Sequence, residues 1–167
     1  MRPVHDTSTA LHTAIARQLR QDIAARLVDP LDVLLDPETG ATAALRRQLE
    51  ADVEMWAAQV IGPDERLAAA TASRLVSAVY RDGDRFDPPA RWWRTPFGNL
   101  VARRFGHPGA EVVGLTAASA MLGITRQGAH DLVKRGKLHR DPSGAGILVS
   151  SVRDRLNSAG AVTSDGR

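Results

Sequence analysis

The chain of 167 residues contains no cysteine, which excludes disulfide bonds and thiolate metal sites. Aromatic residues make up only 4% of it. No apolar run approaches the roughly 20 residues of a membrane-spanning helix, and residues 1–6 lack the apolar centre of a secretory signal peptide. With hydrophobic and charged contents of 43% and 25%, we expect a globular cytoplasmic protein with no membrane partner.

Patterns of catalytic and metal-binding residues are also missing. The histidines are dispersed, and none lies at metal-ligand spacing from another or beside a cluster of acids. Neither a glycine-rich phosphate loop nor a nucleophile elbow is present. Asp82, Asp84 and Asp87 do not complete a calcium loop, so we expect an acidic turn there and not a cation site. We therefore predict a protein that is not an enzyme and has no cofactor.

Before residue 82 the sequence predicts three amphipathic helices. The first spans 8–28, where leucine and isoleucine recur every four residues, and is expected to stop at Asp29-Pro30. The second spans 42–61. The third is expected to open at Pro63, with the proline near its first position, and to run to Tyr80. The apolar positions of the second helix are Leu45, Leu49, Val53, Trp56 and Val60.

These helices can cover their apolar faces in two ways. They can form an intramolecular bundle, or they can pair with a second copy of the chain to give a homodimer. The periodicity is compatible with both. We assign residues 1–108 to one amino-terminal helical region.

Aromatic residues and arginines are interleaved between residues 87 and 108. The segment holds two of the three Trp, two of the three Phe and four Arg, with no acid after Asp87. Its rings can stack on nucleic-acid bases while the arginines hold phosphates. The alternative, which we favour, is that the rings pack in the core and the arginines stay in solvent.

Residues 113–156 have the pattern of two short helices and a hairpin. The first helix carries Leu115, Ala118 and Leu122 on one face and ends at Gly123. Thr125 is a suitable N-cap for the second helix, which ends in a basic turn before Gly136. Two helices joined by a tight glycine turn are typical of a helix-turn-helix.

The chain after the second helix predicts a small wing. Two short segments, 137–140 and 147–149, flank a turn rich in Asp, Pro, Ser and Gly, which is typical of a two-stranded hairpin. Ser150 or Ser151 is then expected to cap a closing helix that carries Val152 and Leu156.

This stretch resembles the winged helix-turn-helix of the excisionase and MerR-like DNA-binding families. The matching residues are 118–123, 124–127, Leu132-Val133 and 136–138, and the match covers about a quarter of the chain. Gly114, Gly128 and Ala129 depart from the family pattern. The resemblance implies a DNA-binding domain over residues 112–157.

The fold expected for the whole chain is therefore mostly α. An amino-terminal helical bundle precedes a small winged helix-turn-helix with a two-stranded hairpin. Residues 158–167, rich in Ser, Gly and Ala, are expected to form a mobile tail.

The charge distribution favours double-stranded DNA as the partner. Between residues 112 and 157 there are seven Lys or Arg against three Asp, a local balance of +4, whereas the whole chain carries only +3. Neutralisation of phosphates requires such a local excess on the segment that enters the groove. The bias toward Arg and Ala is typical of a GC-rich bacterial genome.

Position in the motif predicts the role of each site residue. Thr125, Arg126 and Gln127 open the second helix, the part that enters a major groove, where Arg pairs with guanine and Gln with adenine. His130 lies one turn further on. Contacts to phosphates are expected from the cations that follow, namely Lys134, Arg135, Lys137 and Arg140.

Three functions fit these observations. The leading hypothesis is a bacterial transcriptional regulator that binds double-stranded DNA sequence-specifically, with the second helix in the major groove and the wing on the backbone. The first alternative is an excisionase-like architectural factor for recombination, or a partition factor. The second is a protein-interaction module that does not bind DNA. A homodimer formed through the amino-terminal helices would double the DNA site.

Overall fold

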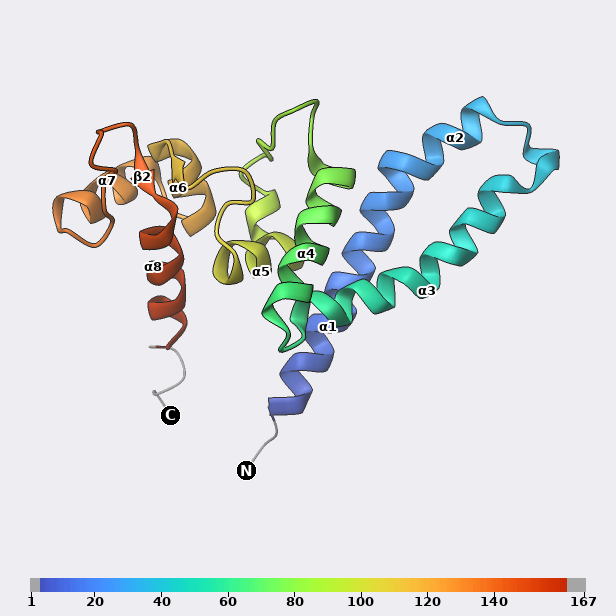
Figure 1. Ribbon diagram of the computed structural model, residues 1–167, viewed down its shortest axis with the longest axis horizontal. Coiled ribbons are helices and arrows are strands. Elements are labelled where there is room, and N and C mark those ends of the chain that lie inside the picture. Colours follow the sequence, from blue (N-terminus) through green and yellow to red (C-terminus); the bar gives the residue numbers. More distant parts are fainter. Residues whose placement is uncertain (1–3, 162–167) are drawn as a thin grey trace. The chain divides into compact units, whose positions relative to one another are not determined.

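The computed structural model describes residues 4–161, which are mostly helical (Figure 1). The chain divides into two compact units, Met1–Arg81 and Asp82–Arg167. The boundary expected near residue 108 therefore lies inside the second unit. The aromatic segment before residue 108 packs within the second unit, where His107 contacts the rings of Phe86 and Trp93.

Over residues 4–81, the first unit contains four α-helices: α1 (Val4–Ile23), α2 (Asp29–Leu34), α3 (Ala41–Ile61) and α4 (Glu65–Leu75). Helix α3 packs against both α1 and α4, and their apolar faces meet in a core. That core includes Ile15, Leu19, Val28, Val53, Val60, Ala68, Leu75 and Val79. The three helices predicted from the periodicity are confirmed.

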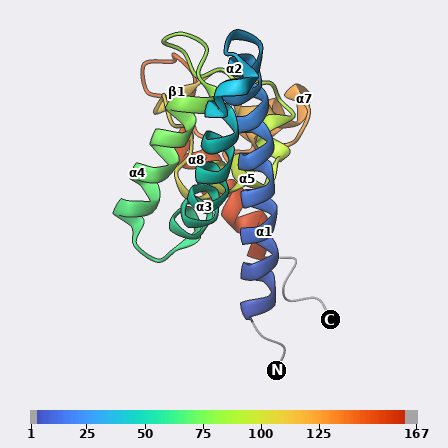
Figure 2. The ribbon, with the colours of Figure 1, turned by 90° about the vertical axis from the view of Figure 1, so that its right-hand side faces the viewer.

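The first helix does not stop at Asp29-Pro30, as we had expected. Residues Ala24–Val28 form a π-helical turn, and α2 follows it directly, so that α1 and α2 form one helical run (Figure 2). Proline has no N–H to donate inside a helix. Pro30 lies in the first turn of α2, directly after the π-helical turn, where the run changes from the π-helical to the α-helical hydrogen-bond pattern.

The start of α4 also differs from the prediction. Asp64 is the N-cap, and its carboxylate accepts hydrogen bonds from the main-chain N–H groups of Arg66 and Leu67 at 3.1 and 3.0 Å. Pro63 thus precedes the cap instead of occupying the first helical position. A π-helical turn, Val76–Tyr80, extends α4 to the predicted end.

Ion pairs join α3 to the run formed by α1 and α2. Arg20 donates to Glu50 at 2.6 Å and to Glu54 at 3.0 Å, while Arg46 pairs with both Asp29 and Asp32. Hydrogen bonds from Thr42 and Arg46 lower the pKa of the Asp32 carboxyl. Exposed pairs of this kind contribute little to stability, but they neutralise charge locally.

Apolar side chains remain exposed at and around α2. Val33 and Leu34 are 85% and 79% exposed, and three further leucines are partly exposed. We call these five residues the α2 patch: Leu27, Val33, Leu34, Leu35 and Leu45. Leu45 thus departs from the expected buried face of its helix.

Over residues 82–161, the second unit combines four α-helices with a short 3-10 helix, Trp92–Arg94, and a small sheet. Its helices are α5 (Pro96–Arg104), α6 (Leu115–Leu122), α7 (Arg126–Lys134) and α8 (Val149–Ala161). Strand β1 (Val112–Val113) pairs antiparallel with β2 (Ile147–Leu148). Helix α8 packs on α5 and α6, and α6 packs on α7. The core includes Phe97, Val101, Val113, Ala118, Met121, Ala129, Leu138, Ile147, Val152 and Leu156.

The expected hairpin is present only in reduced form. Segment 137–140 contributes a single bridge, between Arg140 and Ile147. The main partner of β2 is β1, a strand that we did not predict. Each strand has only two residues, and only Val113 of β1 is buried. The alternation of buried and exposed residues that identifies a strand in a sequence is therefore too short to be recognised in β1.

The predicted cap of the closing helix was wrong. Helix α8 begins at Val149, before both serines. Ser151 is buried, and its hydroxyl donates to the Leu148 carbonyl at 2.8 Å while accepting from the His139 N–H at 3.0 Å. This serine therefore joins segment 137–140 to the start of α8 instead of capping the helix.

The aromatic residues of segment 87–108 confirm the core interpretation. Trp92, Trp93 and Phe97 are buried, and Trp92 meets Trp93 and Phe86 edge to face at 4.9 and 5.2 Å between ring centroids. Stacking of these three buried rings on bases is thereby excluded. Phe105 is half-buried.

The chain end differs in part from the expected tail. Residues 158–161 belong to α8, whereas 162–167 lie outside the described residues. Among helices within 4–161, none combines the length and the apolar character needed to cross a membrane.

The first prediction concerns His107, which packs against the rings of Phe86 and Trp93. Burial lowers its pKa below the ordinary 6.5, and Asp87 opposes this only in part. Its Nδ1 accepts the Gly109 N–H at 3.1 Å, which requires the neutral form. Since the unfolded chain then binds a proton more readily, stability should fall as the pH drops through 6.5 toward the folded-state pKa.

Urea unfolding at about pH 7.5 and 5.5 measures this effect. In a Trp56→Phe background, fluorescence reports the second unit alone, because its two Trp are the remaining ones. His107→Asn keeps an acceptor for Gly109 but does not titrate, so its loss of stability at the lower pH should be smaller. An equal loss in both proteins would contradict the prediction.

Candidate nucleic-acid interface

Helix α7 is held between two glycines with left-handed backbone. Gly123 (φ 68°) ends α6, with its N–H donating to Ala120 and that of Ile124 donating to Ser119. Gly136 (φ 65°) ends α7, where Lys137 N–H donates to the Leu132 carbonyl at 2.8 Å. The carboxyl ends of α6 and of α7 thus both have the Schellman arrangement, which satisfies carbonyls left over by each helix. The glycine turns predicted from the sequence are confirmed.

Thr125 acts as the N-cap of α7. Its hydroxyl oxygen accepts the Gly128 N–H at 3.0 Å. The predicted cap is confirmed, and it gives this residue a structural role alongside the DNA contact expected of it. The side chain is exposed, and the hydroxyl proton is not used in this hydrogen bond.

One face of α7 carries the predicted base-reading side chains. At about 100° per residue, four of the predicted site residues fall within an arc of roughly 100°. They are Arg126, Gln127, His130 and Lys134. All are exposed except His130, which is half-buried, while Ala129 on the other side of the helix is fully buried. The helix therefore packs through small and aliphatic residues and presents its polar arc to solvent.

Asp131 lies beside this arc and was not among the predicted site residues. Its Oδ1 accepts a hydrogen bond from Gln127 Nε2 at 3.1 Å. Arg135 Nε donates to the Asp131 main-chain carbonyl at 3.3 Å and not to its carboxylate. The spacing of four residues on one helix could have indicated the contact with Gln127.

The loop 141–146 is built around Asp141. Its carboxylate accepts hydrogen bonds from the N–H and the hydroxyl of Ser143, and its carbonyl accepts the Gly144 N–H at 2.8 Å. The Asp141 N–H donates to Gly146 across the loop at 2.9 Å. Lys137 and Arg140, both exposed, lie on either side of the buried Leu138 in the segment that leads into this loop.

Charge differs between the two units. Met1–Arg81 contains nine Lys or Arg and eleven Asp or Glu, which gives a net charge of −2. Asp82–Arg167 contains thirteen Lys or Arg and eight Asp or Glu, which gives a net charge of +5. Among residues 112–157 no cation forms an ion pair with a described acid. In the first unit, by contrast, Arg20 and Arg46 are each paired with two carboxylates.

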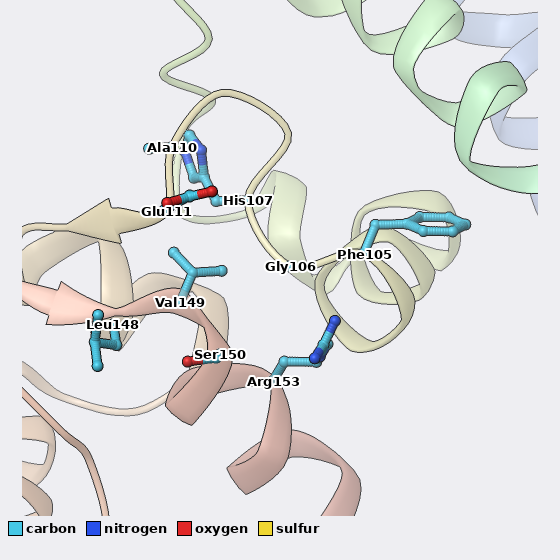
Figure 3. A pocket seen from close by; sticks show the side chains of 9 residues that line it. All are labelled: Phe105, Gly106, His107, Ala110, Glu111, Leu148, Val149, Ser150 and Arg153. Atoms are coloured by element: carbon cyan, nitrogen blue, oxygen red, sulfur yellow. The ribbon is translucent and has the colours of Figure 1, made fainter. Parts of the chain in front are cut away.

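A pocket of about 330 Å³ lies between α8 and the loop that joins α5 to β1 (Figure 3). His107, Ala110 and Glu111 line it from the loop between α5 and β1, and Ser150 and Arg153 line it from α8. None of the predicted DNA contacts is among its lining residues. Groups of three or more His, Asp or Glu that could hold a metal ion are absent from the part of the chain described here.

Comparison of the chain with protein-family models, curated proteins and solved structures gives no match.

The second prediction concerns the cap of α7. Thr125→Ala removes the acceptor for Gly128, so the second unit should lose about 1 kcal/mol of its free energy of unfolding. Thr125→Ser keeps a hydroxyl at the same place and should retain most of that stability. Urea unfolding of both variants measures the difference, and equal stabilities for Ala and Ser would show that the cap contributes nothing.

Proposed function

We propose that the protein binds double-stranded DNA sequence-specifically through α7, with the loop 141–146 and the segment before it on the phosphate backbone. The fold that we propose for residues 112–157 is a winged helix-turn-helix. Its biological role would be that of a bacterial transcriptional regulator.

One observation carries this proposal: the exposed cations of α7 and of the segment that follows have no carboxylate partner among the described residues. Arg126, Lys134, Lys137 and Arg140 all belong to this group. A polyanion can neutralise them without first breaking an ion pair. Phosphate contacts of this kind supply much of the affinity of a protein for DNA.

The shape of α7 suits a major groove. An α-helix with its side chains is about 10–12 Å in diameter, which fits a groove about 12 Å wide, and the nine residues of α7 extend about 13 Å along the helix axis. Arg126 and Gln127 occupy the first turn, the part of a recognition helix that reaches base edges. Lys134 and Arg135 lie at the other end, where contacts to phosphates fix the register without reading sequence.

An architectural role in recombination or partition would use the same surface. Selection of bound duplexes from a random pool, followed by mapping of the selected sequence in the genome, would separate the roles. Sites at promoters favour regulation, and sites beside an integrase gene or a partition locus favour the alternative. A module that binds protein alone would select no sequence.

The third prediction is that Arg126→Ala weakens binding to the selected duplex by about 1–3 kcal/mol and relaxes preference at one base pair. Lys137→Ala should weaken binding to all sequences alike and reduce the salt dependence by about one unit of slope. Fluorescence anisotropy at several salt concentrations measures both effects.

Arg47→Ala is the matched control for these variants. Arg47 is exposed on α3 in the first unit and makes no hydrogen bond or ion pair with any described residue. Its loss removes the same charge from the other unit, so affinity should change little. Equal losses for Arg47→Ala and Arg126→Ala would indicate a general charge effect and refute the assignment of Arg126 as a base-reading residue.

We also propose that two copies of the chain pair through the α2 patch. Val33 and Leu34 expose most of their apolar surface to water in a single chain, and contiguous exposed apolar residues commonly mark interaction sites. A two-fold dimer would present two α7 helices to two half-sites, which matches the need of a short motif for a longer DNA site.

The fourth prediction is that Leu34→Lys shifts the solution mass from dimer to monomer. Because this side chain is 79% exposed, the substitution should leave the fold intact, as circular dichroism would show. Light scattering coupled to size exclusion measures the mass. A wild-type chain that is monomeric at high concentration would exclude pairing through the patch.

A further inference from the structure

We infer that Asp131 is a positioning residue that makes Gln127 select adenine over guanine and that limits affinity for DNA of random sequence. The inference rests on the proposed function, and it adds a specificity determinant to the same surface.

The contact between the two side chains fixes the orientation of the Gln127 amide. An ionised carboxylate only accepts hydrogen bonds, so the group 3.1 Å from Asp131 Oδ1 must be the amide nitrogen and not the amide oxygen. One of its two N–H groups is then occupied. The amide oxygen and the second N–H of the exposed Gln127 remain available to a ligand.

These two free groups match the edge of adenine. In the major groove adenine offers the N6 donor and the N7 acceptor, which pair with one amide oxygen and one N–H. Guanine offers two acceptors, O6 and N7, and would require two donors. With one N–H held by Asp131, Gln127 has only one donor left, so its discrimination against guanine increases.

The charge of Asp131 acts separately from this orientation. It is the only acid in α7, on a helix whose ends carry Arg126 and Lys134. No ion pair with a described cation neutralises its carboxylate. A negative charge near the phosphates opposes binding to every sequence alike, and specificity increases when the contacts that do not read sequence are weakened.

The test is Asp131→Asn in the full chain, a change that keeps size and removes the charge. Asparagine can accept from or donate to the Gln127 amide, so both orientations of that amide become available. Duplexes are chosen by selection with the wild-type protein, and the base pair read by Gln127 is the one at which Gln127→Ala loses preference. Affinities are measured for that site with adenine, for the same site with guanine, and for a random duplex.

We expect Asp131→Asn to reduce the preference for adenine over guanine about tenfold, which is within the range of a bidentate contact. Affinity for the random duplex should rise about threefold or more at low salt, and less at high salt. Asp154→Asn is the charge control, because Asp154 is an exposed acid of α8 in the same unit whose side chain makes no described contact. It should leave the preference for adenine unchanged.

The possible outcomes are distinguishable. An unchanged preference for adenine in Asp131→Asn overturns the positioning role, and equal gains in random-DNA affinity for Asp131→Asn and Asp154→Asn overturn the specific effect of its charge. A wild-type protein that binds no duplex at all would refute the proposed function and, with it, this inference. Circular dichroism shows that each variant is folded.

Discussion

The geometry of the candidate interface depends on how the two ends of α7 are fixed. This helix has nine residues and only Ala129 of them is fully buried, so packing alone holds it weakly. The hydroxyl of Thr125 and the left-handed turn at Gly136 satisfy main-chain groups that so short a helix leaves over at its two ends, while Gly123 ends α6 and turns the chain toward α7. Because the ends provide this support, the outward arc can be wholly polar.

Basic side chains and carboxylates have different roles in the two units. In the first unit Arg20 and Arg46 join neighbouring helices through carboxylates. In the second, the cations of residues 112–157 stay unpaired among the described residues, and Asp141 uses its carboxylate for the turn of a loop. Net charge over the whole chain hides this contrast, since −2 and +5 combine to only +3.

The sequence predicted features that depend on neighbours along the chain. The amphipathic helices, the turn at Gly123 and the cap at Thr125 were all readable, because each depends on spacing of four residues or fewer. Strand β1, the hydrogen bonds of Ser151 and the boundary at residue 82 depend on segments distant in sequence, which no local pattern encodes. The sequence did not predict that the helical run continues through Pro30. A proline in the first turn of a new helix looks the same in a sequence as a proline that ends the preceding helix.

The small residues Gly128 and Ala129 of α7 explain why restraint of the Gln127 side-chain conformation matters for specificity. A Cβ at position 128 would lie 3.3 Å from the capping oxygen of Thr125, so glycine keeps that cap unstrained. Glycine and alanine at 128 and 129 also leave Arg126, Gln127 and His130 as the side chains that extend from the first turns. When only a few side chains contact the bases of a DNA site, conformational freedom in any one of them directly reduces the sequence specificity of binding. A carboxylate four residues away restricts that freedom without adding a bulky neighbour to the helix surface.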